Sequence, residues 1–357
     1  MTEQKTRKKI PEFLSLAAQQ QASDIFIIAG RPLSIKKDGK LIDYGERLMP
    51  EHTAELIHHI YDLADNRDIR CLTDRGDDDF SFSIPGLSRF RVNAYRQRGS
   101  LAAVIRVIAF ELPDPERLHI PKEVMDTSEF TKGLVLVTGP AGSGKSTTMA
   151  CLIDRINHTR EGHIITLEDP LEYLHRHDKC IVSQREICTD THSYLVSLRA
   201  TLRQSPDVIL LGEMRDYETI QTAMTAAETG HLILSSLHTI GAANTIGRIM
   251  DVFDPSQQHQ IAIQLSMVLQ AVISQQLIPD VDGHIIPVFE IMRLTPAIRN
   301  MIRDSKVHQI DGVISSSTQG QMKSMDQSLL ELYKKGAITK EKALKYASNE
   351  EMLKRKL

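Results

Sequence analysis

Residues 134–146 read LVLVTGPAGSGKS, and this stretch decides the fold. An apolar run is followed by a glycine-rich turn that matches the phosphate-binding pattern G-x-x-x-x-G-K-[ST] in full, from Gly139 to Ser146. Residues 147–156 can continue as a helix. A strand, such a turn and a helix in this order surround an anion with backbone N–H groups and the positive end of a helix dipole. The stretch therefore predicts a P-loop nucleotide-binding core.

The side chains of this loop have distinct expected roles in binding a nucleotide with its metal ion. We expect Lys145 to reach the β- and γ-phosphates of ATP and the Ser146 hydroxyl to bind Mg²⁺. The glycines allow backbone N–H groups to turn toward phosphate oxygens. The predicted nucleotide-binding residues of the loop are Gly139, Pro140, Ala141, Gly142, Ser143, Gly144, Lys145, Ser146 and Thr147.

Three more apolar runs follow the loop, at residues 164–167, 208–211 and 232–236, with segments between them that can form helices. Short, wholly apolar runs are typical of strands that are buried on both faces of a parallel sheet. The sequence thus predicts a doubly wound α/β domain over residues 122–357. From about Gln257 onward the pattern predicts a mostly helical tail.

Two of the predicted strands end in carboxylates, at the sheet edge where open α/β folds bind ligands. Residues 207–213, DVILLGE, form the second element expected of a P-loop protein, an apolar strand that ends in a carboxylate. Gly212 stands where the usual metal-linked Asp would be, so we expect Glu213 to orient or deprotonate the attacking water. Glu168 is the better candidate to help hold the metal ion, and Asp169 is the second. For Glu213, the alternative is a glutamate that only begins a helix. For Glu168 and Asp169, the alternative is an ordinary polar loop after Leu167.

Two histidines, His231 and His238, stand at opposite ends of one predicted strand, so they cannot share a metal ion. The one at the carboxyl end, His238, could sense the γ-phosphate and is included among the nucleotide-binding residues. For each histidine a structural role remains the alternative.

Residues 1–110 show a different, mixed pattern that predicts a small α+β domain, and residues 111–121, with three prolines, predict a linker. Alternating residues place Arg89, Arg91 and Asn93 on one face of a strand, and Arg106 lies on the next. The expected elements are helices over 13–22 and 51–66, a strand over 25–28, a hairpin turn at Asp38-Gly39, and strands over 80–84, 90–94 and 101–108.

The motifs add up to a known family. A phosphate loop, an acidic box at 165–173, an atypical Gly-Glu element at 206–216 and a histidine box at 229–239 occur in that order. In these respects the chain resembles the secretion-type hexameric ATPases, and specifically the PilT-like, twitching-motility pilus retraction ATPases. The N-terminal part resembles the family's PAS-like domain through Ser23-Asp24-Ile25 and residues 89–94. Only about the first eight and last ten residues fall outside the resemblance.

This resemblance implies a RecA-like ATPase domain preceded by a smaller α+β PAS-like domain. It implies ATP and Mg²⁺ as cofactors, with Arg91 and Arg106 closing over the nucleotide as catalytic residues. Arg98 matches the family pattern less well, and solvated arginines on an exposed sheet face are the alternative. The expected partners are five further copies in a homohexamer, an inner-membrane pilus platform protein and a paralogous retraction ATPase. The expected location is the cytoplasmic face of the inner membrane.

Residues 295–304, TPAIRNMIRD, resemble the family's retraction motif. They predict an amphipathic helix with Ile298, Met301 and Ile302 on one face and Arg299, Asn300 and Arg303 on another. Pilus assembly ATPases generally carry a longer N-terminal region and a four-cysteine metal motif, and neither is seen in this sequence. The retraction motif at residues 295–304 therefore favours a pilus retraction ATPase over a secretion or conjugation ATPase of the same superfamily. An accessory retraction ATPase remains an alternative.

Composition and charge disfavour several other classes of protein. The formal charge of −3 and the absence of Trp disfavour a nucleic-acid translocase. No apolar run is long enough to predict a membrane span, and the charged first ten residues predict no secretory signal. Four cysteines without CxxC spacing predict reduced thiols.

Overall fold

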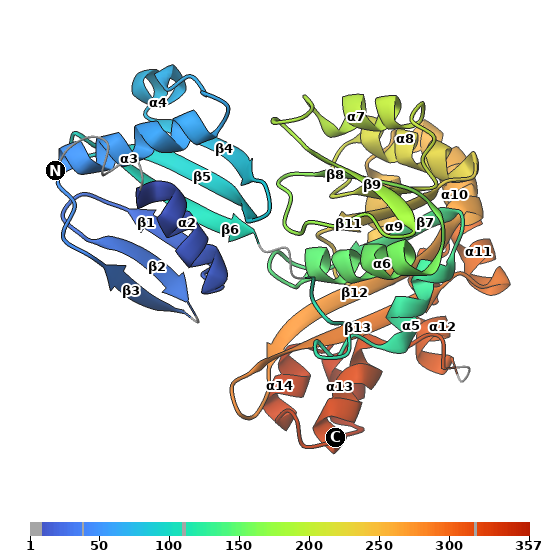
Figure 1. Ribbon diagram of the computed structural model, residues 1–357. Coiled ribbons are helices and arrows are strands. Elements are labelled where there is room, and N and C mark those ends of the chain that lie inside the picture. Colours follow the sequence, from blue (N-terminus) through green and yellow to red (C-terminus); the bar gives the residue numbers. More distant parts are fainter. Residues whose placement is uncertain (1–8, 38, 109–111, 318–319) are drawn as a thin grey trace. The chain divides into compact units, whose positions relative to one another are not determined.

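A computed structural model describes residues 9–37, 39–108, 112–317 and 320–357 (Figure 1). The chain divides just before Leu112 into two compact parts, named here the N-terminal unit and the C-terminal unit. Residues 1–8 and 109–111 lie outside the described residues, so the predicted linker is described only from Leu112. Within the described residues, none of the helices combines the length and the apolar character needed to cross a bilayer.

In the N-terminal unit, the described strands form a six-stranded antiparallel sheet in the order β3-β2-β1-β6-β5-β4. One face packs on the helices through alternate apolar residues such as Phe90, Val92 and Ile105, all fully buried. The opposite face carries the arginines. The elements are α2 (Lys9–Gln19), β1 (Asp24–Ile27), β2 (Leu33–Lys37), β3 (Lys40–Tyr44), α3 (Pro50–Leu63), α4 (Arg70–Arg75), β4 (Asp77–Ile84), β5 (Ser88–Gln97) and β6 (Ser100–Ile108).

The expected elements of this unit are present with shifted ends. The first helix begins at Lys9 rather than Phe13, because Ile10 also packs into the core. The predicted hairpin joins β2 and β3, and Gly39 has a φ of 75° there, while Asp38 lies outside the described residues. The short helix α4 was not predicted, since it buries only Leu72 and shows no helical period.

The C-terminal unit is built on a seven-stranded sheet in the order β13-β12-β7-β11-β10-β8-β9. All neighbouring strands are parallel except β12 and β13, which form an antiparallel hairpin. The strands are β7 (Gly133–Thr138), β8 (Gly162–Glu168), β9 (Cys180–Glu186), β10 (Val208–Leu211), β11 (Leu232–Leu237), β12 (Leu269–Pro279) and β13 (Ile285–Arg293).

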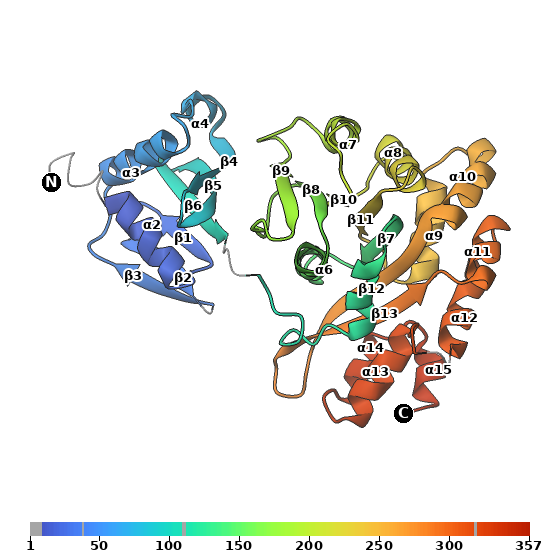
Figure 2. The same ribbon diagram turned by 45° about the vertical axis from the view of Figure 1, so that its right-hand side comes forward.

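Helices cover both faces of this sheet, as expected for a doubly wound fold (Figure 2). On one face lie α5 (Lys122–Met125) and α6 (Lys145–Thr159). The other face is covered by α7 (Tyr194–Thr201), α8 (Tyr217–Glu228), α9 (Ala242–Asp251), α10 (Pro255–Val268), α11 (Pro296–Arg303) and α12 (Ile310–Ser316). Along each central strand, alternate side chains pack into the two cores on opposite faces of the sheet, which is why these strands are apolar throughout.

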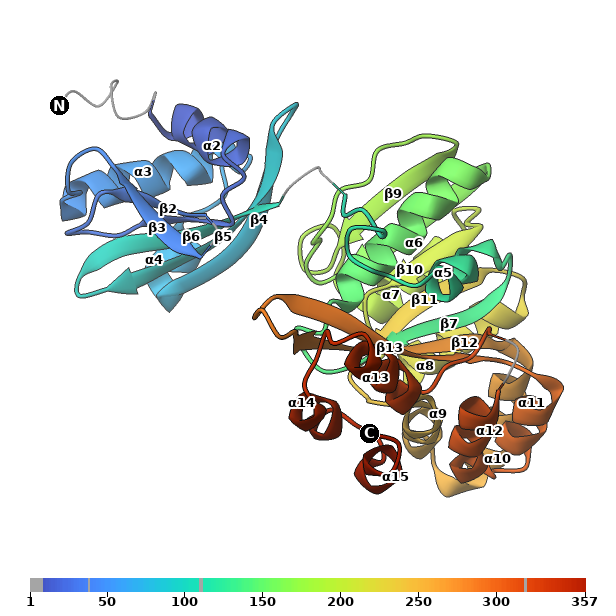
Figure 3. The same cartoon turned by 90° about the horizontal axis from the view of Figure 1, so that it is seen from below.

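A third, smaller core lies at the distal part of the β12–β13 hairpin (Figure 3). There α13 (Met325–Lys334), α14 (Lys340–Lys345) and α15 (Glu350–Lys354) pack around Ile278 and Val288. The prediction of a mostly helical tail is wrong for this hairpin. Its first strand directly follows α10 without a Gly or Pro between them, so the sequence carries no boundary signal.

Candidate nucleotide site

The phosphate loop lies between β7 and the N-terminus of α6, and its glycines are required by contact and by backbone angle. Gly139 has a φ of 142°, and a Cβ there would lie 2.1 Å from the backbone oxygen of Gln275. Gly144 has a φ of 85°, and its Cβ would lie 2.9 Å from the Gln275 side-chain nitrogen. Any other residue would have to displace β12 or strain the loop. The loop is therefore held tightly against β12.

Lys145 lies inside this loop. Its side chain is buried, and Nζ donates hydrogen bonds to the carbonyl oxygens of Gly139 and Pro140, both at 2.9 Å. The nearby Ser143 hydroxyl is also buried, and within the described residues it has no hydrogen-bond partner. A buried ammonium and an unsatisfied hydroxyl beside a helix N-terminus fit a phosphate group.

His238 connects Lys145 with Glu213. One ring nitrogen, Nδ1, lies 3.5 Å from Lys145 Nζ, and the other, Nε2, lies 3.4 Å from Glu213 Oε2. The Glu213 side chain is only 14% exposed, and its second oxygen accepts from Arg215 Nε at 2.6 Å. The structure thus brings three predicted site residues together at the carboxyl edge of the sheet. Arg215 was not predicted.

His231 lies at the other end of β11. Its Nδ1 is 2.9 Å from the carbonyl oxygen of Ala226 and 3.3 Å from the Thr229 hydroxyl, at the end of α8. These contacts give His231 a structural position at a helix end. Of the two histidines, only His238, the one predicted among the nucleotide-binding residues, lies beside the phosphate loop.

Glu168 ends β8, and the exposed Asp169 follows it. Both lie near the Tyr194 hydroxyl at the start of α7. Burial raises the pKa of the Tyr194 phenol, and the negative charges of Glu213, Asp169 and Glu168 raise it further. Tyr194 was not predicted, because nothing in the sequence around it marks a site.

The absence of a side chain at Gly212 has a structural reason. A Cβ at this position would lie 2.8 Å from the Tyr194 hydroxyl and 3.3 Å from the Leu167 carbonyl oxygen. The residue that replaces the usual acid therefore lets α7 and β8 approach β10 closely.

Gln275 in β12 is another residue that the sequence did not reveal. It is 3% exposed, and its side-chain oxygen accepts from the Thr148 hydroxyl at 2.7 Å. With its close approach to Gly139 and Gly144, Gln275 fixes the start of α6 and the loop to β12.

A cavity of about 220 Å³ opens beside the loop. Its walls come from residues 117–120, from Gly144 and Thr147, and from the apolar side chains of Leu277 and Ile285. Such a cavity, apolar and next to a phosphate site, fits a planar base. The segment expected to be only a linker thus supplies one wall of it.

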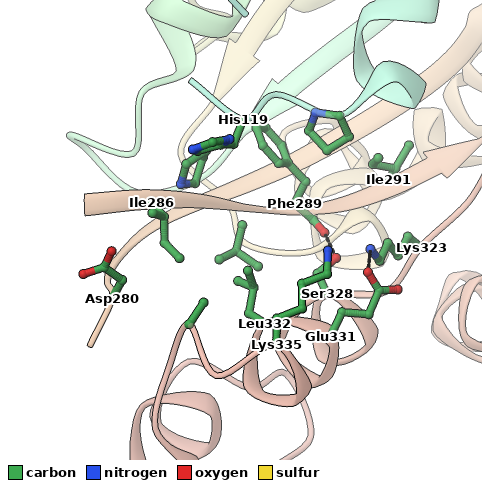
Figure 4. A pocket seen from close by; sticks show the side chains of 14 residues that line it. His119, Asp280, Ile286, Phe289, Ile291, Lys323, Ser328, Glu331, Leu332 and Lys335 are labelled. Atoms are coloured by element: carbon green, nitrogen blue, oxygen red, sulfur yellow. Dashed lines mark hydrogen bonds and ion pairs between the residues drawn. The ribbon is translucent and has the colours of Figure 1, made fainter. Parts of the chain in front are cut away.

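A second cavity, of about 430 Å³, lies between β13, α13 and the segment around His119. Figure 4 shows Lys323 paired with Glu331, with an Nζ to Oε2 distance of 2.6 Å, and the Ser328 hydroxyl donating to the Phe289 carbonyl. Its other labelled walls include Ile286 and Leu332. None of the predicted site residues lines this cavity.

In the N-terminal unit, Arg91 and Arg106 lie directly opposite each other on β5 and β6. Each is paired with an aspartate, Arg91 with Asp79 at 3.4 Å and Arg106 with Asp24 at 3.2 Å. Directly opposed like charges destabilise a sheet. The two aspartates offset this repulsion, and both arginines lie on the sheet face that does not contribute to the core.

The sheet topology and the phosphate loop define a P-loop nucleotide-binding protein of the doubly wound class. Residues 2–309 match the model of the Type II/IV secretion system protein family, and the chain belongs to this family. It is 44% identical to the type IV pilus retraction ATPase PilT of Pseudomonas aeruginosa over 335 residues, which cover 94% of this chain and 96% of that one.

Two further similarities agree with this. The chain is 38% identical to the type IV pilus ATPase PilU of the same bacterium, over 95% of this chain and 88% of the relative. Its structure matches a crystal structure of the pilus retraction motor PilT with bound ADP. That match has a TM-score of 0.88 and 44% identity, and it covers 96% of this chain and 98% of the other. The predicted membership of the PilT-like secretion ATPases, and the predicted fold class, are confirmed.

Proposed function

We propose that this chain hydrolyses ATP to power retraction of a type IV pilus. The observation that carries the proposal is the grouping of Lys145, His238 and Glu213 beside the phosphate loop. A phosphate-binding cation and a carboxylate base, joined through an imidazole, suit a γ-phosphoryl transfer to water. The similar proteins are named as a pilus retraction ATPase and a pilus retraction motor, which supports pilus retraction as the work to which hydrolysis is coupled.

Each residue then has a definite task. Lys145 and the backbone N–H groups of residues 139–147 bind the phosphates. Ser146 and Glu168 would hold Mg²⁺, which supplies charge neutralisation of the phosphates when bound. Glu213 accepts a proton from the attacking water. His238, which lies between Lys145 and Glu213, connects the position of Glu213 with that of the phosphate-binding lysine. Arg215 orients the Glu213 carboxylate.

Arg91 and Arg106 complete the site as partners for the charge that develops on the transferred phosphate. The permanent charge and planar donor geometry of a guanidinium support this role, because both suit a phosphate group. Arg98 has a φ of 49° and lies at a turn after β5, so it forms no row with the other two arginines.

The working assembly that we propose is a homohexamer at the cytoplasmic face of the inner membrane, where it acts on a pilus platform protein. A paralogous retraction ATPase is a further proposed partner, supported by the similarity to PilU. On α11 the apolar residues Ile298 and Ile302 are fully buried, while Arg299, Asn300 and Arg303 are exposed. These three polar residues are available to engage a neighbour or the platform.

Three experiments test the function. The purified chain should release phosphate from ATP, and Lys145→Ala should nearly abolish release. Deleting the gene in its host should leave cells with excess, immobile pili, and complementation should restore retraction. Normal retraction in the deleted strain would instead favour an accessory motor or a secretion ATPase. Salt-dependent DNA binding by the wild-type chain would favour a translocase.

A further inference from the structure

One buried carboxylate, Glu290 in the middle of β13, connects two helices of the C-terminal unit. The side chain is 5% exposed. Its Oε1 accepts from the backbone N–H of Ala242, the first residue of α9, at 2.8 Å. Its Oε2 accepts from the backbone N–H of Met325, the first residue of α13, at 3.4 Å. The carboxylate therefore satisfies orphan donors at two helix N-termini.

The α9 end of this connection is adjacent to the proposed catalytic site. Only residues 239–241 separate His238 from Ala242. Within this short loop, the Gly241 N–H donates to the buried Ser274 hydroxyl at 2.9 Å. Ser274 stands directly opposite Glu290 in the β12–β13 hairpin. The loop after His238 is thus tied to the hairpin at two successive backbone N–H groups.

The conformation of this loop is specific. Gly241 has a φ of 86° and a ψ of 145°, a combination open essentially to glycine alone. A Cβ there would lie 3.7 Å from Glu290 Oε1. The chain direction after His238 is therefore set by a glycine and held in place by Ser274 and Glu290.

Burial raises the pKa of Glu290, and the nearby carboxylates of Asp311 and Asp326 raise it further, while the two backbone N–H groups oppose this. Asp311 and Asp326 line the same cavity as Glu290. A hydrophobic or amide side chain would avoid this electrostatic cost. Only a carboxylate, however, offers one acceptor oxygen to each of the two helices.

We infer that Glu290 is a positioning residue that holds the His238 imidazole between Lys145 and Glu213 by fixing the loop that leads into α9. The inference rests on the proposed ATPase function and extends it to a residue that touches neither nucleotide nor water. Because Glu290 also holds the start of α13, it connects the position of His238 with the C-terminal helices.

The test is a double-mutant cycle. In Glu290→Gln, the amide can accept from only one helix, so one N–H loses its partner. We expect kcat to fall between about tenfold and a hundredfold, as for a misplaced catalytic group, with KM unchanged within about twofold. Ser274→Ala is a milder second variant that removes only the Gly241 contact. Glu228→Gln, an exposed glutamate at the end of α8, is the matched control and should keep normal kinetics.

The decisive comparison uses His238→Gln. If Glu290 acts through His238, adding Glu290→Gln or Ser274→Ala to His238→Gln causes little further loss in kcat. Losses that multiply in the double variants, or folded single variants with normal kcat, would overturn the inference.

A second readout does not depend on hydrolysis. In histidine-labelled protein, the imidazole resonance that disappears in His238→Gln should shift in Glu290→Gln and in Ser274→Ala, but not in Glu228→Gln. An unshifted His238 resonance in both variants would overturn the inference. If the wild-type chain hydrolysed no ATP, the proposed function would fail, and this spectroscopic arm would still decide whether Glu290 positions His238.

Discussion

Replacing Glu213 by glutamine separates nucleotide binding from hydrolysis. The amide has the shape of the carboxylate and can still accept from Arg215, which lies 2.6 Å from Oε1. It cannot take a proton from water. A positioned base is worth roughly 10²–10⁴ in rate, which corresponds to about 2.7–5.5 kcal/mol of activation free energy. We therefore expect kcat to fall by that factor while nucleotide affinity changes by about twofold or less.

Phosphate release and binding of a fluorescent nucleotide would measure the two quantities on the same preparation. Glu218→Gln is a suitable control, because Glu218 is exposed in the first turn of α8. Turnover by Glu213→Gln at the wild-type rate would refute the assignment of Glu213 as the base. Loss of nucleotide binding would show instead that this carboxylate maintains the shape of the site.

Three other outcomes are expected. Arg91→Ala and Arg106→Ala should each lower ATP turnover by at least about tenfold. The melting temperature should change little, because each removes only one ion pair at the protein surface. Normal turnover in both variants would exclude these arginines from the mechanism. An Arg299→Ala, Asn300→Ala double variant should lose less than about 0.5 kcal/mol of stability and hydrolyse ATP, yet fail to restore twitching in a deletion strain. Native thiol labelling followed by peptide mapping should modify the exposed Cys188 first.

The buried thiols provide the contrast for the labelling experiment. Burial raises the pKa of Cys151 to about 12, and burial also raises the pKa of Cys180. Both thiols should therefore react only after unfolding. Early modification of Cys151 in the native protein would contradict the packing of α6 on the sheet.

The central fold could be predicted because its strands are buried on both faces. Residues 208–211 are all apolar for this reason, and β10 has the predicted bounds. The phosphate loop could be predicted because its chemistry demands residue types at fixed spacing. The edge strand β9 was not predicted, since CIVSQRE mixes apolar with polar residues and only part of it is buried.

The residues that sequence reasoning missed act across long separations. Thr148 and Gln275 form a hydrogen bond although 127 positions separate them. No local pattern distinguishes Gln275 from its neighbour Gln276, and only the register of β12 against β7 turns the former toward the loop. His238, by contrast, could be predicted, because it stands at the carboxyl end of β11, whereas His231 stands at the other end.

Gly212 and Tyr194 have a consequence for how this site can vary. Installing the usual aspartate at position 212 would place its Cβ 2.8 Å from the Tyr194 hydroxyl, so the tip of that phenol would have to move. Restoring that acid therefore also changes the position of the Tyr194 side chain, which lies near Glu213, Asp169 and Glu168. The two positions are coupled, although one follows a strand and the other begins a helix.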